Sequence, residues 1–422
     1  MSRFRRSVAE HAALVADLMR EVPVPTRQAP LADALGRVLA ADVAAPIPLP
    51  VFDNSQMDGY AVRAADLDGA RLAIGRPIAA GAPGGPLAPG TAAPIMTGAP
   101  VPDGADTVVP VEAADPDVFP PFVADRTLPH DDGARVALPA PPATRPGQFV
   151  RRAGSDVPAG GRALRAGDRI TARHAGLAAA LGLARLPVIA APTALLIATG
   201  DEVVAPGGDL GPGQIFDANT TLLAASLAEA GWEAATLTVD TDDPEDFAAA
   251  LRAAVVRHDP AVILTSGGIS AGAYEVVKLA LGAGGHSVEF GSVAMQPGGP
   301  QGAGRLDVGG RTVPLLAFPG NPVSAFVSFE MFLRPVLVER FGARPRPAVT
   351  ARLAGAADSP AGKLQVRRAR YAADGTVELL GGPGSHLLAP LADANALALI
   401  DPETTRADPG ARLSTILIGE IQ

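Results

Sequence analysis

Three apolar runs after residue 190 each end in a glycine-containing polar turn. Their sequences are IATGDEV, LTSGGISAG and AFPGNPVSA, starting at residues 197, 264 and 317. Glycine lets backbone N–H groups come close to an anion, and a parallel sheet binds its ligands beyond the carboxyl ends of its strands. One such turn would indicate only a tight bend, but three on one edge predict a site for phosphate-like groups.

The second and third turns supply most of the polar groups expected at this site. Pro322 suits the first position of a helix, Asn321 before it is a candidate N-cap, and a helix start attracts anions. Neither turn contains a Walker loop or the dinucleotide-binding GxGxxG motif. The predicted ligand-binding residues of these turns are Thr265, Ser266, Gly267, Gly268, Ser270, Gly272, Pro319, Gly320, Asn321, Pro322 and Ser324.

Two pairs of acidic residues, Asp201–Glu202 and Asp242–Asp243, follow strands at the same edge. Carboxylates beside a phosphate repel it unless a cation lies between them, and Mg²⁺ takes one or two carboxylates plus phosphate oxygens. We therefore expect Glu202, Asp242 and Asp243 to bind Mg²⁺. The alternative is that Asp242 and Asp243 cap the helix beginning at Pro244; one aspartate suffices for the cap, so both interpretations can hold.

A second polar cluster lies in the first third of the chain. The segment FDNSQMDGYAV places two acids, an amide and a hydroxyl between Phe52 and Tyr60, and the segment IMTGAPVPDGADTVV carries Thr97 before a Gly-Ala-Pro turn. By itself this cluster is typical of a polar turn. Asp58 and Thr97 become candidate functional residues only together with the motifs described below.

Composition excludes some classes of function. The 422 residues carry a formal net charge of −9, which argues against broad binding to nucleic acids or anionic membranes. Cysteine is absent, so disulfides, thiolate metal sites and a cysteine nucleophile are excluded. Glu10, His11 and Asp17 interrupt the apolar stretch after the basic N-terminus, which favours a helix over a signal peptide. We expect a cytoplasmic protein.

The chain predicts a multidomain α/β plus β fold. From about residue 190, apolar strands alternate with helices, which indicates a three-layer α/β domain with a mostly parallel sheet. We expect helices at residues 8–19, 31–43 and 272–285, and a helix capped by Asn219. The predicted domains are residues 1–50 with 148–190 (helical linker), 51–147 (β-rich insertion), 191–342 (α/β) and 343–422 (a C-terminal, small β-barrel-like domain).

Seven segments together resemble the molybdopterin molybdenumtransferase (MoeA) family, which includes the E domain of gephyrin. They are FDNSQMDGYAVR, IMTGAPVPDGADTVVPVE, RRAGSDVPAG, IATGDEV, GQIFDANT, SGGISAG and FPGNPVSA, in family order across nearly the whole chain. The resemblance implies adenylylated molybdopterin and molybdate as substrates, Mg²⁺ as cofactor and AMP as product. It also implies an elongated homodimer of four-subdomain chains, with each active-site cleft shared between subunits.

The resemblance assigns roles to further residues and suggests macromolecular partners. It implies catalytic roles for Asp58, Thr97, Asp156, Glu202 and Asp242, although Ser155 stands where the family often has glutamate. It adds Lys278, Gln296 and Ser385 to the ligand-binding residues. Molybdopterin adenylyltransferase, molybdoenzymes and their chaperones are the partners that it suggests.

One segment, FGSVAMQPGGPQGAG, departs from the family pattern. Ser292, Gln296 and Gly299 stand where the family usually has lysines that would bind molybdate and phosphate. Lys278 and four arginines are candidates to compensate: Arg152, Arg367, Arg368 and Arg370. The departure keeps open a catalytically weakened paralogue or a non-catalytic scaffold, and the α/β domain also resembles a molybdopterin adenylyltransferase. The flanking β domains disfavour the last alternative.

Overall fold

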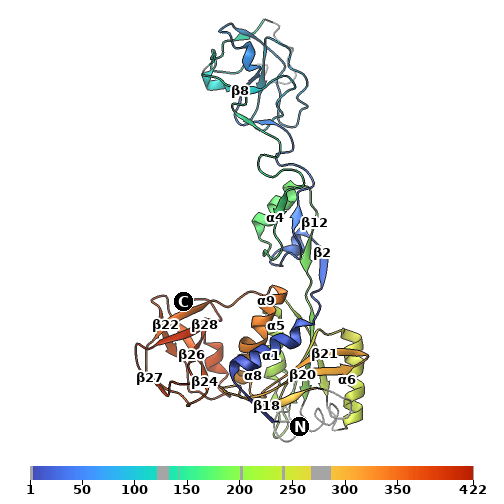
Figure 1. Cartoon of the computed structure of the whole chain (residues 1–422), viewed down its shortest axis with the longest axis vertical. Coiled ribbons are helices and arrows are strands. Elements are labelled where there is room, and N and C mark those ends of the chain that lie inside the picture. The colour runs from blue at the N-terminus through green and yellow to red at the C-terminus, as the bar shows by residue number, and fades with distance from the viewer. Residues whose placement is uncertain are drawn as a thin grey trace. The chain divides into compact units, whose positions relative to one another are not determined.

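The chain forms two compact units, each with its own buried core. The computed structural model describes residues 3–120, 133–141, 143–199, 203–239, 243–267 and 287–421. One unit comprises Met1–Arg27 and Ile189–Gln422, and the other comprises Gln28–Val188 (Figure 1). Within the described residues, no helix is both long and apolar enough to cross a membrane.

A seven-stranded sheet forms the centre of the first unit. Its strand order is β1-β18-β20-β21-β17-β13-β16. Four neighbours, β21, β17, β13 and β16, run parallel as predicted, and β20 is antiparallel to both β21 and β18. The strands are β1 (Arg3–Arg6), β13 (Thr193–Thr199), β16 (Glu233–Val239), β17 (Val262–Ser266), β18 (Glu289–Val293), β20 (Pro300–Val308) and β21 (Arg311–Phe318).

Glycines interrupt the apolar pattern in β20, so the sequence did not predict this strand. A Cβ at Gly302 would lie 2.4 Å from the Phe290 ring, and one at Gly304 would lie 2.1 Å from the Ser287 carbonyl oxygen. Glycine normally weakens a strand, but here only glycine leaves room for the neighbouring strand. The sheet is therefore mixed at this end, in addition to its predicted parallel part.

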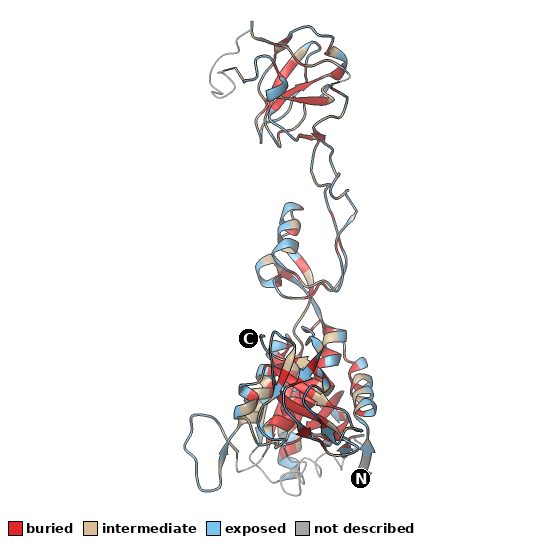
Figure 2. Cartoon of the chain, turned by 90° about the vertical axis from the view of Figure 1, so that its left-hand side faces the viewer, coloured by how far each residue is buried: buried red, intermediate tan, exposed pale blue. Residues whose placement is uncertain are grey.

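Helices cover both faces of this sheet. Leu196, Leu264 and Leu316 pack against helices α1, α5, α8 and α9 on one face, whereas Leu195 and Ile263 pack against α6 on the other. Figure 2 shows the strands as mostly buried and the helices as exposed on their outer sides. The helices are α1 (Val8–Arg20), α5 (Ala218–Glu229), α6 (Pro244–His258), α8 (Pro322–Ser328) and α9 (Arg334–Phe341).

The helical run that begins at Pro322 contains a π turn. Pro322 is at the start of α8 as predicted, but a π-helical segment, Phe329–Leu333, separates α8 from α9. Its Glu330 is fully buried and bonds to Arg334 at 2.8 Å and to Arg346 at 3.1 Å. Because Arg346 lies just before the C-terminal strands, this ion-pair cluster fastens the C-terminal part to the α/β part.

The C-terminal residues of the same unit form a small closed β-barrel. The strand order is β19-β24-β25-β22-β28-β26, and β24 also pairs with β26, which closes the barrel. The elements are β19 (Met295–Gln296), β22 (Ala348–Leu353), β24 (Leu364–Tyr371), β25 (Thr376–Leu379), β26 (Ala396–Ile400), β28 (Arg412–Leu417), the pair β23 (Ala357–Asp358) and β27 (Arg406–Ala407), and α10 (Ala389–Ala392). A two-residue pair, β14 (Val203–Val204) and β15 (Ile215–Phe216), lies in the α/β part.

The second unit contains a five-stranded sheet of order β8-β5-β7-β6-β9. It also contains three two-stranded pairs, β2–β12, β3–β11 and β4–β10. The strands are β2 (Thr26–Pro30), β3 (Val43–Ala44), β4 (Asn54–Ser55), β5 (Gly59–Val62), β6 (Leu72–Ile74), β7 (Thr91–Ile95), β8 (Thr107–Pro110), β9 (Arg135–Val136), β10 (Val150–Arg151), β11 (Arg162–Leu164) and β12 (Arg185–Ile189). The helices are α2 (Leu31–Ala34), α4 (Ala172–Ala180) and the 3₁₀ turns η1 (Ala64–Asp66) and η2 (Val111–Ala113).

The helix predicted over residues 31–43 is mostly absent. Helix α2 ends at Ala34, and Gly36 adopts a left-handed backbone with φ of 75°. Val38 and Leu39 then form β-bridges with Arg169 and Val188. A glycine that can adopt positive φ ends a helix readily, and the buried bridges that follow stabilise the extended chain. The N-terminal helix α1 is present as predicted, with a Ser7–Glu10 capping box.

Candidate active site

Two of the predicted glycine turns meet at the carboxyl edge of the seven-stranded sheet. Strands β17 and β21 are neighbours with Ser266 opposite Phe318, and the Gly267 N–H donates to the Phe318 carbonyl oxygen at 3.2 Å. Gly267 has φ of 93°, and a Cβ at Gly320 would lie only 3.1 Å from the Gly267 Cα. The close approach therefore requires glycine, and it places two turns rich in backbone donors side by side.

Asn219 connects a third segment to these turns, in a role different from the one predicted. Helix α5 is capped by Asp217, whose Oδ1 accepts from the Thr220 N–H at 2.9 Å, so the prediction of Asn219 as the cap is wrong. Asn219 lies inside the first helical turn. Its side-chain amide donates to the Gly320 carbonyl oxygen at 2.6 Å, which fixes the orientation of that peptide group.

The predicted ligand-binding residues of the two turns differ in accessibility. Thr265 is 5% exposed and Ser324 is 3% exposed, so their hydroxyls are buried within the fold. Ser266 and Pro322 are half-buried, Pro319 is buried, and Gly320 and Asn321 are exposed. Asn321 occupies the N-cap position without a side-chain capping bond. Gly268, Ser270, Gly272 and Lys278 lie outside the described residues.

The acidic residues predicted at this edge are only partly described. Glu202 and Asp242 lie outside the described residues. Asp243 is the N-cap of α6, and its Oδ1 accepts from the Glu245 and Asp246 N–H groups at 2.7 and 3.2 Å. The capping alternative thus accounts for Asp243. Its metal-binding role stays a prediction, and among the described residues no group of three or more possible metal ligands occurs.

In the second unit, Asp58 and Thr97, the two candidate residues of the polar cluster, bond to each other. The Asp58 Oδ1 accepts from the Thr97 N–H at 2.6 Å and from the Thr97 hydroxyl at 2.8 Å. Both residues are exposed. Asp58 precedes β5 and Thr97 follows β7, and these strands are antiparallel neighbours, with Gly59 opposite Ile95. The pairing therefore brings Asp58 and Thr97 together and orients the carboxylate toward solvent-accessible space.

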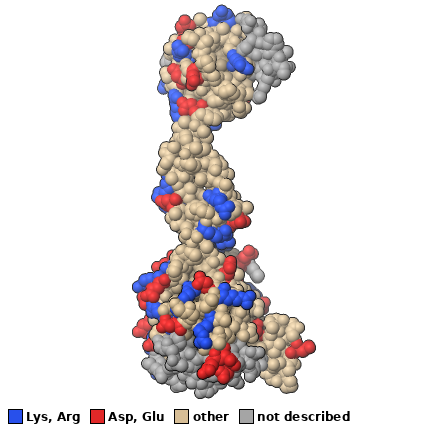
Figure 3. Space-filling model, turned by 90° about the vertical axis from the view of Figure 1, so that its right-hand side faces the viewer, with Lys and Arg blue, Asp and Glu red and all other residues tan. Residues whose placement is uncertain are grey.

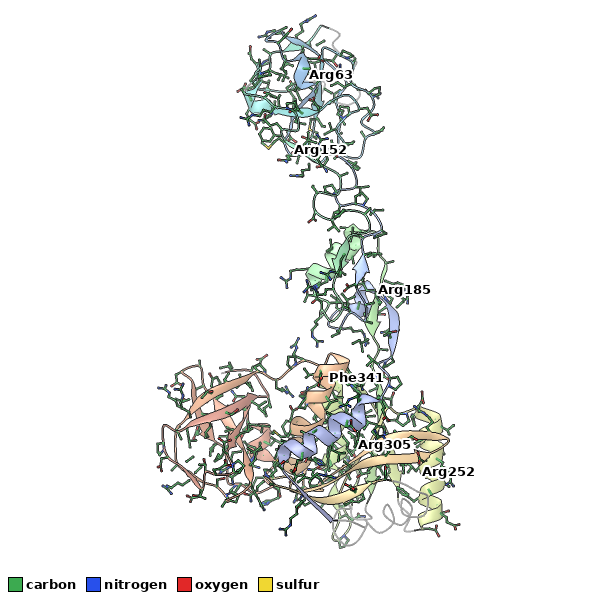
Figure 4. The ribbon with its side chains drawn as sticks, in the orientation of Figure 1. Arg63, Arg152, Arg185, Arg252, Arg305 and Phe341 are labelled. Atoms are coloured by element: carbon green, nitrogen blue, oxygen red, sulfur yellow. The ribbon has the colours of Figure 1, made fainter. Side chains whose placement is uncertain are left out.

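Asp53 and Arg152 form a second polar contact in this unit, and it holds the segment RRAGSDVPAG. Arg152, which is labelled in Figure 4, bonds to Asp53 Oδ2 at 2.5 Å. The Ala153 N–H donates to Asp53 Oδ1 at 2.7 Å. The Ala153 N–H and then Arg152 hold the pKa of Asp53 below its usual value. Arg152 is therefore neutralised by an acid. Asp156 is exposed in the turn that follows, and its N–H donates to the Leu49 carbonyl oxygen.

Gln296 lies where the α/β part meets the C-terminal barrel. Its strand β19 is parallel to β24, and its side-chain oxygen accepts from the Gln365 amide at 3.1 Å. Gln365 is 1% exposed and was not predicted. The sequence signal for Gln365 was a polar residue between two apolar ones in the predicted strand KLQVRRARY.

Arg367 and Arg368 on the same strand are buried, with 7% and 3% exposure. Arg367 donates to the Gly381 carbonyl oxygen at 2.8 Å, and Arg368 donates to those of Gly382 and Gly384. Burial lowers the pKa of both guanidinium groups, and the charge of Arg367 lowers that of Arg368 further. These arginines hold the loop that leads to half-buried Ser385. Within the described residues, neither forms an ion pair with a carboxylate.

Comparison with known proteins defines the class. Three family regions match in order along the chain: the MoeA N-terminal region (domain I and II) over residues 6–182, a probable molybdopterin binding domain over residues 195–339, and the MoeA C-terminal region (domain IV) over residues 350–418. The fold is that of MoeA proteins, because a MoeA crystal structure from Pyrococcus matches with a TM-score of 0.80 and 27% identity, covering 99% of this chain and 100% of that one.

Individual relatives cover nearly the full length. Molybdopterin molybdenumtransferase 2 of Mycobacterium tuberculosis is 46% identical, with 97% of this chain and 98% of that protein covered. Molybdopterin molybdenumtransferase 1 of the same organism is 34% identical, with 94% and 95% covered. The chain belongs to the MoeA family.

Proposed function

We propose that this chain inserts molybdate into adenylylated molybdopterin, with Mg²⁺-dependent release of AMP. It is an enzyme of molybdenum cofactor biosynthesis, a molybdopterin molybdenumtransferase, as its full-length relatives are named. Its substrates, its metal and the nucleotide that it releases are proposed.

The observation that carries the proposal is the backbone contact between Gly267 and Gly320 at the carboxyl edge of the sheet. Two strand-end turns that touch through glycine have no side chain between their backbones at this point, so N–H groups other than that of Gly267, which bonds to Phe318, can face a shared anion. A pyrophosphate group has the charge and the many acceptor oxygens that such a surface binds. Half-buried Ser266 adds a hydroxyl at the same place.

Asp58 is the proposed acid of the second unit. Because both Thr97 donors bond to Oδ1, that oxygen is fixed and the carboxylate has one orientation. We propose that Oδ2 receives a hydrogen bond or a proton from the substrate, and that Asp156 acts in the neighbouring turn. A carboxylate positioned in this way can serve in proton transfer.

Glu202 and Asp242 are the proposed Mg²⁺ ligands, with Asp243 as a third candidate that already caps α6. A bound Mg²⁺ would neutralise charge on the phosphate oxygens. Glu202→Gln or Asp242→Asn is expected to lower turnover far more than stability. If either variant released AMP at the normal rate, that residue would have no part in the reaction.

Arg367, Arg368 and Ser385 are the proposed oxyanion-binding group of the barrel. The two guanidinium groups are bonded to carbonyl oxygens and, among the described residues, to no carboxylate, so their charge is not neutralised. Gln296 adjoins them through Gln365 and can donate a neutral hydrogen bond. This group is what favours an active enzyme over the alternative of a weakened paralogue.

We also propose a homodimer, the four-domain division given above and a cytoplasmic location. Asp58 and Thr97 belong to one compact unit and the glycine turns to the other, which favours an active site completed by a second subunit. Sedimentation at micromolar concentration should show a dimer, and a monomer alone would contradict the proposal.

The direct test is to incubate the protein with adenylylated molybdopterin, molybdate and Mg²⁺ and to measure AMP. Release of AMP that requires molybdate and stops on addition of a chelator supports the proposed reaction. Binding of the substrate without any AMP release would instead support the scaffold alternative.

A further inference from the structure

Strand β1 adds an arginine beside a position where the family usually has lysine. Strand β1 is parallel to β18 at the edge of the seven-stranded sheet, with Arg5 opposite Ser292 and Arg6 opposite Val293 (Figure 1). Ser292 is one of three positions, with Gln296 and Gly299, where the resemblance leads us to expect lysine. Ser292 lies near the end of β18, Gln296 ends β19, and Gly299 directly precedes β20.

Arg5 and Ser292 lie at the ligand-binding edge of the sheet. Strand β18 is antiparallel to β20, and β20 is antiparallel to β21, so β18 and β1 run in the same direction as β21 and β17. Ser292 is opposite Pro300, and Gly302 is opposite Ala317. Continuing this register places Ser292 level with the turn after Phe318, which is the turn that contacts Gly267.

The side chains of Arg5 and Ser292 leave the sheet on the same face. Paired residues of neighbouring strands point to one side, and the strands are about 4.8 Å apart. Serine is short and arginine is long, so the guanidinium can extend over Ser292 into the space that a lysine at residue 292 would fill. Both residues are exposed.

Arg5 differs from its neighbour Arg6 in having no acidic partner. Arg6 forms an ion pair with Glu289, which neutralises it. The Arg5 side chain makes no hydrogen bond or ion pair with any residue that the structure describes. Basic and acidic side chains are interspersed on the face of each unit displayed in Figure 3.

We infer that Arg5 binds an oxyanion of the substrates, the role that a lysine at residue 292 would otherwise have. The inference rests on the proposed function. A guanidinium presents a planar pair of donors that suits molybdate and phosphate oxygens alike. The charge lost at residue 292 of β18 is thus supplied by the adjacent strand, from nearly 300 residues earlier in the chain.

Calorimetric binding of molybdate and of AMP tests the inference. Arg5→Gln removes the charge and keeps a shorter polar side chain, and it should raise the dissociation constant for one of these anions about tenfold. Arg5→Lys should have a smaller effect. The matched control is Arg20→Gln, an exposed arginine of the same N-terminal segment, which should change neither constant.

A second-site variant makes the test specific. Adding Ser292→Lys to Arg5→Gln should restore binding, because the lysine returns charge to the same place. A raised constant for molybdate identifies the metal oxyanion as the ligand, and a raised constant for AMP identifies the phosphate. Unchanged constants for both anions in Arg5→Gln, with an unchanged melting temperature, would overturn the inference. AMP release by the unmodified enzyme tests the proposed function separately, since it does not depend on these variants.

Discussion

Each compact unit contains arginines that were candidates for anion binding, and their surroundings differ. Arg152 of the second unit bonds to Asp53 at 2.5 Å, with 59% of its side chain exposed. Arg367 and Arg368 of the first unit are buried and donate to the carbonyl oxygens of a glycine-rich loop. The candidate arginine of the second unit is thus neutralised, whereas the two of the first unit keep their charge.

This difference indicates how the units divide the chemistry. An exposed ion pair stabilises a protein by little, and its charges are already satisfied. A buried cation without an anionic partner is costly, so a bound anion that satisfies it gains affinity. We infer that the second unit contributes its acid, Asp58, and that the first unit contributes cations and backbone donors. The predictions below test this division.

The largest expected effect is on Asp58. Asp58→Asn should lower the rate of AMP release about 100-fold or more, because an amide cannot accept the proton or hydrogen bond that we assign to the carboxylate. Single-turnover measurements at saturating substrate will show it. Asp53→Asn is the matched control, five residues earlier in the same segment, and should leave the rate within about threefold. Equal losses in both variants would mean that the segment acts only structurally.

The second prediction compares Arg368 of the first unit with Arg152 of the second. Arg368→Ala removes a buried guanidinium group and its hydrogen bonds to the Gly382 and Gly384 carbonyl oxygens, and it should lower the free energy of unfolding by about 3 kcal/mol. Arg152→Ala should cost less than about 1 kcal/mol, as for other exposed ion pairs. Denaturant titrations of both variants measure the difference. Similar losses of stability in the two variants would show that burial does not distinguish Arg368 from Arg152.

The third prediction concerns a buried group that stays neutral. His11 of α1 is 1% exposed and meets the Phe332 ring edge-on at 4.7 Å. Burial, with a smaller effect from Arg6, lowers the pKa of His11 from 6.5 to about 4. Below pH 6.5 the unfolded chain binds a proton that the folded chain does not, so stability is full above pH 6.5 and falls toward pH 4.

The loss linked to His11 should reach about 3 kcal/mol. His11→Phe keeps an aromatic ring against Phe332 and should remove this part of the pH dependence. Thermal unfolding of both proteins between pH 4 and pH 8 measures it. Parallel curves for the two proteins over this range would show that His11 titrates normally.

The smallest expected effect is a gain in apparent affinity for molybdate. Gln296→Lys should lower the molybdate concentration needed for half-maximal AMP release about tenfold, because a charged donor replaces a neutral one. Ser292→Lys should lower it less, because Arg5 already brings charge to that place. The unmodified enzyme should need excess molybdate for full turnover. If it already saturates at low molybdate and the variants gain nothing, Arg367, Arg368 and Arg5 supply the charge without help.

Much of the fold was predictable because its signals are local. Continuous apolar runs mark strands β13, β16, β17 and β21. The helices that follow these strands have clear start signals, such as Pro322 at the start of α8. The strands of residues 287–308 were missed because Gly302 and Gly304, which the packing requires, disrupt any apolar pattern. The helix predicted over residues 31–43 failed because Gly36 and two long-range bridges prevail over local helix propensity.

The sequence by itself determined the motifs, their order and hence the family and the reaction class. The tertiary structure decided which charges are satisfied: Asp53 neutralises Arg152 from 99 residues away, Asn219 holds Gly320 from 101 residues away, and Arg5 stands beside Ser292. Helix and turn preferences act over a few residues and can be read along the chain. Hydrogen bonds and ion pairs depend on distance in space, which only the packed fold sets.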